Sequence, residues 1–151
     1  MNIEHIFISL KIGEPQTESH RIEVVAGEGI KGDRNFGLSA YAGQNITFIE
    51  AEIVEQFIQN YSRAYDLSIT RRNIITRGVR LNELVGKSFQ IGTIQFLGIE
   101  LCEPCLELGK NLSSATVAPK EIVKWFVHKG GLRADILSSG FIENGMAVEI
   151  A

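Results

Sequence analysis

Short strand-like runs separated by glycine-containing turns are the sequence feature that most limits how this chain can fold. Each run is rich in β-branched, aliphatic or aromatic residues, which is typical of β-strands. The runs cover residues 2–10, 21–25, 44–48, 71–80, 87–91, 93–101, 132–137 and 146–150. Because they do not alternate with helical segments, a doubly wound parallel sheet is not expected. The pattern predicts a mainly β fold, a closed or nearly closed β-barrel with about two peripheral helices.

Two segments place their apolar residues at helical spacing. Residues 49–63 carry an apolar stripe, with three glutamates in the N-terminal half, where the helix dipole favours acidic side chains. We interpret this segment as a helix packed on the core, not as an acidic catalytic cluster. Residues 119–129 begin with Pro119, which suits a first helical turn, and precede Gly130-Gly131, which suits a helix end.

The composition is that of an ordinary soluble globular protein. The chain has 151 residues, 44% hydrophobic and 22% charged, so we expect one domain over residues 1–151. A net charge of −3 gives no overall attraction to nucleic acid or to an anionic membrane. No segment has the apolar length of a membrane span or the basic start of a signal peptide. Two cysteines do not form a disulfide framework, so the reducing cytoplasm is the expected location.

Both cysteines, Cys102 and Cys105, follow the longest strand-like run directly, with Pro104 between them. A structural zinc site needs about four ligands, and the chain has no second cysteine pair. A thioredoxin-like redox pair would need the motif to open a helix, and Gly109 argues against a helix there. On the residues alone, a ligand or nucleophile and a pair of buried small hydrophobic side chains both remain open.

Residues 71–80 hold four of the eight arginines, and no acidic residue occurs from 67 to 82. On a strand, Arg72 shares one face with Ile74 and Thr76, while Asn73 and Arg77 share the other. Guanidinium groups and an asparagine amide suit phosphate oxygens and polar heterocycles. A solvated basic edge strand explains the same pattern, and nucleic acid binding lacks the interleaved aromatic residues.

Residues 27–37 contain four glycines, which indicates tight turns or a close backbone approach. No clear helix follows, so a dinucleotide-binding fingerprint is not supported. Lys31 and Arg34 are candidates to meet an anion, and Asp33 with Arg34 also suits a surface ion pair.

The ordered set of these motifs resembles the MOSC domain family, named after the C-terminal domain of molybdenum cofactor sulfurase. The resemblance covers nearly the whole chain as a stand-alone domain. The chain departs from the pattern at Asn35, where the family often has histidine. In family order the matching pieces are Gly32-Asp33-Arg34, Arg72-Asn73-Ile74, Leu84-Val85-Gly86, Phe89 with Ile91-Gly92, Cys102-Glu103-Pro104-Cys105, Gly131-Leu132-Arg133-Ala134, and Gly140 with Gly145.

The resemblance implies a barrel similar to that of pyruvate kinase and binding of the molybdenum cofactor, molybdopterin, or a related sulfur species. It implies that Cys105 is the thiolate ligand of molybdenum and the catalytic residue, whereas Cys102 is structural or auxiliary. It also implies cofactor-binding roles, with phosphate and pterin held first by the Arg-Asn-Ile segment. The cofactor-binding candidates are Arg72, Asn73, Arg77, Arg133, Lys31 and Arg34.

Two function classes follow from the resemblance. One is a molybdenum-dependent oxidoreductase that reduces N-hydroxylated or N-oxide compounds with electrons from a redox partner protein. The other is a sulfur carrier that uses a Cys105 persulfide, or a cofactor-delivery module. The expected partners are a small-molecule substrate or sulfur donor, with neither nucleic acid nor membrane. In either class we expect Cys105 to line an open pocket near Arg72 or Arg133.

Overall fold

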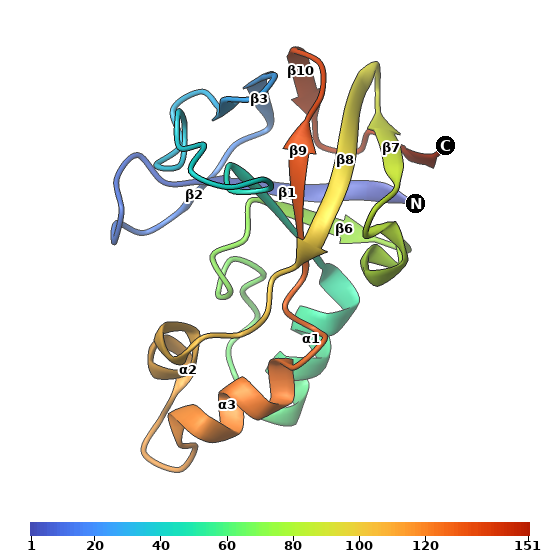
Figure 1. The fold of residues 1–151 in the computed structure, drawn as a ribbon. Helices are drawn as coiled ribbons and strands as arrows, with labels where there is room; N and C mark the ends of the chain where they lie inside the picture. Colours follow the sequence, from blue (N-terminus) through green and yellow to red (C-terminus); the bar gives the residue numbers. More distant parts are fainter.

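A strongly curled eight-stranded sheet forms the largest part of the computed structural model, which describes residues 1–151 (Figure 1). In sheet order its strands are β11 (Val148–Ile150), β7 (Ser88–Ile91), β8 (Ile94–Leu101), β9 (Leu132–Ile136), β5 (Ile46–Glu50), β6 (Ile74–Arg77), β1 (Asn2–Ile8) and β2 (Thr17–Glu18). A smaller sheet contains β10 (Gly140–Glu143), β3 (Arg21–Val25) and β4 (Gly29–Ile30). The fold is therefore mainly β, as the spacing of the strand-like runs predicts.

The two termini lie close together and bring the ends of the curled sheet toward each other (Figure 1). Asn2 forms a bridge with Ala147, and the Val148 N–H donates to the Met1 carbonyl at 3.0 Å. The Ile3 N–H donates to the Met146 carbonyl at 2.9 Å. The sheet is open rather than fully closed, so the prediction of a barrel is confirmed in its nearly closed form.

Strands β1, β5 and β6 separate two hydrophobic cores. Because neighbouring residues on a strand point to opposite faces, Ile6 packs inside the curled sheet and Phe7 packs beneath the helices. Phe48 and Ile49 of β5 divide in the same way. Burial on both faces explains why these strands appear in the sequence as continuous apolar runs.

Three helices gather at one end of the sheet (Figure 1). α1 (Ala51–Asn60) connects β5 to its parallel neighbour β6, and α3 (Pro119–Phe126) packs against it. The Phe57 and Phe126 rings lie 5.1 Å apart at the centre of this contact. No helix has the length and apolar character needed to span a bilayer.

The third helix, α2 (Leu106–Leu112), was not predicted, and it begins directly after Cys105. Gly109 does not end this helix, because it serves a close helix–helix contact instead. A Cβ at Gly109 would lie 2.6 Å from the Pro119 carbonyl oxygen at the start of α3. The prediction of about two helices is thus one short, and the two predicted helices end earlier than expected, at Asn60 and Phe126.

Candidate functional site

Three arginines converge at the N-terminal end of β6, and we call Arg34, Arg71 and Arg72 the arginine cluster. The Arg34 Nη2 donates to the Arg71 carbonyl at 3.0 Å, and its Nη1 lies 3.2 Å from the Asp33 carboxylate. Burial lowers the pKa of Arg34; the charge of Asp33 opposes this effect, and the charges of Arg71 and Arg72 add to it. The cluster therefore concentrates positive charge in a partly buried place, with Asp33 as the acid in contact.

Arg71 and two residues next to it, Thr70 in the chain and Gln16 in the fold, carry unpartnered polar atoms. The Arg71 Nη2 is buried without a hydrogen-bond partner, and so are the Thr70 Oγ1 and the Gln16 Oε1. Gln16 belongs to the same place, because its Nε2 donates to the Arg71 carbonyl at 3.1 Å. Arg71 also has a φ of +61°, a left-handed conformation that is uncommon outside glycine and recurs at functional sites. Buried unsatisfied groups are unfavourable, so this arrangement suits a bound anionic or polar group.

Arg72 connects the arginine cluster to the cysteine loop. Its Nε donates to the Gly130 carbonyl at 2.9 Å. Gly130 packs so tightly on Cys102 that a Cβ would lie 1.9 Å from the Cys102 carbonyl oxygen, and 3.6 Å from the Arg72 Nη2. The segment that follows α3 therefore has to carry glycine to bring the arginine and the cysteine loop together.

The two cysteines lie in opposite environments. Cys102 is 1% exposed, and burial raises the pKa of its thiol, while the charges of Arg72 and Arg133 oppose that effect. Cys105 is exposed at the start of α2, where its carbonyl accepts a hydrogen bond from the Gly109 N–H at 3.1 Å. Cys105 is therefore the thiol that solvent and solutes can reach.

Arg133 extends the positively charged region along β9. Its Nε lies 3.8 Å from the Glu100 carboxylate, and its guanidinium carbon lies 5.7 Å from the centre of the Tyr41 ring. The side chain is about a third exposed. The charges of Arg133, in β9, and of Arg72, just before β6, thus both act on the Cys102 thiol.

A family model of the MOSC domain matches residues 30–149. The chain belongs to the MOSC domain family. The match includes the arginine cluster, both cysteines and Arg133. The expectation drawn from the ordered motifs is therefore confirmed at the level of the family.

Solved structures share the MOSC fold of this chain at low sequence identity. The YuaD protein from Bacillus subtilis superposes with a TM-score of 0.86 at 17% identity, over 99% of this chain and 94% of that one. YiiM from Geobacillus stearothermophilus gives 0.77 at 16% identity, over 99% of this chain and 74% of that one. YiiM from Escherichia coli gives 0.70 at 13% identity, over 100% of this chain and 70% of that one. A comparison with curated proteins finds no significant match.

Three of the predicted MOSC cofactor-binding residues already have hydrogen-bond or ion-pair partners within the protein. Asn73 is fully buried; its Nδ2 donates to the Phe7 carbonyl at 3.1 Å, and its Oδ1 accepts from Thr47. Arg77 forms ion pairs with Glu4 and Glu55 at the other end of β6. Lys31 pairs with Glu23 at 3.1 Å on the exposed surface. Asn73 therefore holds neighbouring strands together beside the arginine cluster. The charges of Arg77 and Lys31 are already compensated by glutamates.

Sequence reasoning missed two residues of this candidate site, Gln16 and Thr70. Gln16 lies in a polar loop with no pattern to single it out, and 55 positions separate it from Arg71. Thr70 directly precedes the basic segment and is 1% exposed. Each of the two residues has a buried oxygen atom without a hydrogen-bond partner, and this can be recognised only from the structure.

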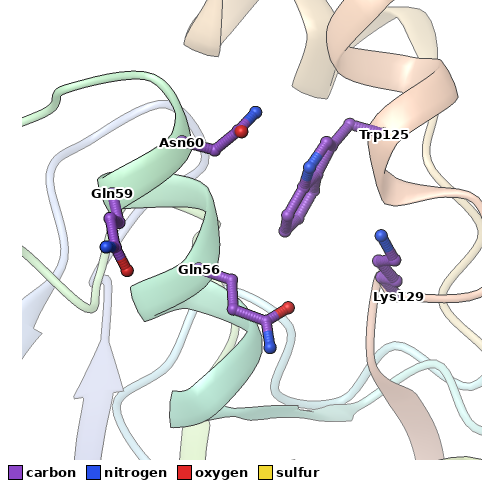
Figure 2. Close-up of a pocket in the computed structure, with 5 residues that line it drawn as sticks. All are labelled: Gln56, Gln59, Asn60, Trp125 and Lys129. Atoms are coloured by element: carbon purple, nitrogen blue, oxygen red, sulfur yellow. The ribbon is translucent and has the colours of Figure 1, made fainter.

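A separate groove of about 500 Å³ lies between α1 and the end of α3 (Figure 2). Three amide side chains, Gln56, Gln59 and Asn60, line one wall. Trp125 and Lys129 line the other, with the Lys129 Nζ 4.4 Å from the centre of the Trp125 ring. None of the residues predicted for the cofactor lines this groove.

Proposed function

We propose that this MOSC domain binds the molybdenum cofactor, with the arginine cluster holding the phosphate of molybdopterin. The observation that carries the proposal is the buried, unpartnered Nη2 of Arg71 beside the guanidinium groups of Arg34 and Arg72. Charge-assisted hydrogen bonds from planar guanidinium groups match phosphate oxygens in geometry and charge. A bound phosphate would both satisfy the Arg71 donor and offset the mutual repulsion of the three cations.

Cys105 is the residue that we propose as the molybdenum ligand. Thiolate is a soft ligand, and the exposed position of Cys105 lets a metal centre reach it without opening the core. Cys102 is ill-suited to this role, because its thiol is buried and burial raises its pKa, which disfavours the thiolate. The charges of Arg133 and Arg72 act on Cys102 in the same loop, and such cations suit the negative charge of a thiolate-ligated centre.

The reaction class that we propose is reduction of N-hydroxylated or N-oxide compounds with electrons from a separate donor. When bound, the cofactor supplies a metal that accepts the oxygen atom from the substrate. The protein contributes the arginine cluster, which fixes the cofactor, and an exposed ligand position that a small molecule can approach. The sequence carries no cysteine set for an iron–sulfur cluster, which is why we propose a separate electron donor.

A second candidate function is sulfur transfer, and the exposure of Cys105 favours it independently of any metal. A reachable thiol can accept sulfur from a donor persulfide and carry it as its own persulfide. In that case the arginine cluster would receive the phosphate of the acceptor molecule rather than that of a resident cofactor.

The test is to purify the protein from a molybdenum-replete host and measure molybdenum, pterin fluorescence and intact mass. For the first function, Cys105→Ser should lose molybdenum, since a hydroxyl is a poor soft-metal ligand. Cys102→Ala is the matched control and should keep most of the metal. For sulfur transfer, the wild type should carry an added sulfur without molybdenum, and Cys105→Ser should lack it. Equal molybdenum and sulfur in wild type and Cys105→Ser would reject both functions.

A further inference from the structure

A cavity of about 370 Å³ lies on the outer face of β9, beneath the loop that leads into β5. Tyr41, Asn45, Asp135 and Leu137 are among the residues that line it. Arg133 does not line the cavity, and neither do Arg34, Arg71, Arg72 or the cysteines. The cavity is therefore distinct from the arginine cluster, although the Arg133 Nη1 donates to the hydroxyl of Tyr41 in its lining at 3.4 Å.

Asn45, in the lining of this cavity, has a hydrogen-bond acceptor without a partner. The residue is 4% exposed, and its Oδ1 is buried without a partner. The Gly29 backbone packs on the side chain so closely that a Cβ there would lie 3.0 Å from the Asn45 Cβ, which restricts its movement. A buried carbonyl oxygen without a donor is unfavourable by about 1–3 kcal/mol, so a donor from a ligand would stabilise this site.

Asp135 gives the cavity a carboxylate. It is the one acidic residue of the lining, and it forms no ion pair with a basic side chain. The Gly43 N–H donates to its Oδ1 at 2.7 Å, which fixes the carboxylate in place. Arg133 is two residues away on the same face of β9, and Glu100 at 3.8 Å offsets its charge.

We propose that this cavity binds a small planar cation with paired N–H donors, a guanidinium or amidinium group carried on an aromatic ring. The Asp135 carboxylate accepts two parallel N–H groups from such an ion in the geometry that makes these pairs strong. The Asn45 Oδ1 accepts a further N–H. The Tyr41 ring and the Leu137 side chain provide the surface for the aromatic part.

The same lining disfavours other ligand classes. An anion would meet the Asp135 carboxylate and the Asn45 carbonyl oxygen. A metal ion would lack ligands, because no group of three or more His, Cys, Asp or Glu side chains in the structure is placed to hold one. The volume of about 370 Å³ is in the range of sites that take a molecule of one or two rings.

The experiment is calorimetric titration of the purified protein with phenylguanidine and with phenylurea, its neutral counterpart of the same shape. The wild type should bind phenylguanidine roughly tenfold more tightly than phenylurea, or better. Asp135→Asn keeps an oxygen for the Gly43 N–H but removes the charge, so it should abolish that preference. Glu149→Gln removes a charge from the exposed end strand and should leave the preference unchanged.

Asn45→Ala provides a second variant whose outcome does not depend on charge. Since the Asn45 Oδ1 has no partner in the free protein, the variant should weaken phenylguanidine binding several-fold without lowering the melting temperature. Equal binding of the two probes by the wild type would overturn the proposal, as would an unchanged preference in Asp135→Asn. An absence of phenylguanidine binding at millimolar concentration would overturn it as well.

Discussion

The two ends of strand β6 carry arginines from the same acid-free segment, yet the fold treats them in opposite ways. At the C-terminal end, Arg77 bonds Glu55 at 2.8 Å and is also paired with Glu4. These bonds raise the pKa of Arg77 and lower the pKa values of both glutamates. At the N-terminal end, Arg71 has a buried Nη2 without a partner. The candidate site thus differs from the structural ion pairs at the other end of β6, because the fold leaves the Arg71 guanidinium without a full set of partners.

Topology explains the difference. β1 runs antiparallel to β6 and pairs Asn2 with Arg77, which places the acidic start of β1 at the C-terminal end of β6. α1 then brings Glu55 to the same end. The N-terminal end of β6 meets loops instead, and Asp33 is the acid that contacts the cluster.

Asn73 lies between the arginine cluster and the ion pairs of Arg77. Its replacement should give the largest change in stability. Asn73→Ala would leave the Phe7 carbonyl and the Thr47 donors buried without their present partner. Unsatisfied buried groups of this kind cost about 1–3 kcal/mol each, so we expect a loss of about 3 kcal/mol in the free energy of unfolding. Denaturant titration followed by circular dichroism measures it.

Asn82→Ala is the matched control for Asn73→Ala. The Asn82 Nδ2 donates to the His128 carbonyl at 2.8 Å, but this bond is exposed to solvent. Water replaces an exposed bond, so the control should lose less than about 1 kcal/mol. Similar losses in the two variants would contradict the view that Asn73 anchors this end of β6.

The sequence alone predicts the basic segment but not the different fates of its arginines. Glu4 and Glu55 lie 73 and 22 positions from Arg77, so the residues around Arg77 do not predict these ion-pair partners. Gln16 likewise lies 55 positions from Arg71 in the chain. Periodicity predicts which segments become strands, whereas the partner of each charge depends on which strands become neighbours.

The cysteine loop shows the same limit. The sequence predicts a motif at the end of a long strand, and β8 does end at Leu101. It does not predict α2, because Gly109 resembles a helix breaker until α3 is packed against it. The burial of Cys102 and the exposure of Cys105 follow from that packing, so spacing alone left their roles open.

Arg71→Gln should weaken cofactor binding, whereas the corresponding change at the other end of β6 should not. Loss of a charge-assisted hydrogen bond to phosphate is worth about 1.5–3 kcal/mol, so cofactor retention should fall by roughly tenfold to a hundredfold. Arg77→Gln, from the other end of β6, should leave pterin content unchanged because both glutamates already occupy that guanidinium. Pterin fluorescence per mole of purified protein measures both variants. Equal pterin content in the two variants would mean that the unpartnered donor does not hold the cofactor.

Arg77→Gln should instead affect stability, by less than Asn73→Ala does. Because the three side chains of the ion pairs are each about a third exposed, water screens them and the loss should be about 1 kcal/mol. The pKa values of Glu4 and Glu55 are lowered, chiefly by hydrogen bonds from Arg77. The stabilisation is therefore fully present above the unfolded-state pKa of about 4.3 and is lost as the pH falls through the lower folded-state values. The difference between wild type and Arg77→Gln in denaturant titrations should be full at about pH 7 and shrink below about pH 4. A difference that stays constant to low pH would show that Arg77 stabilises the strand by packing rather than by charge.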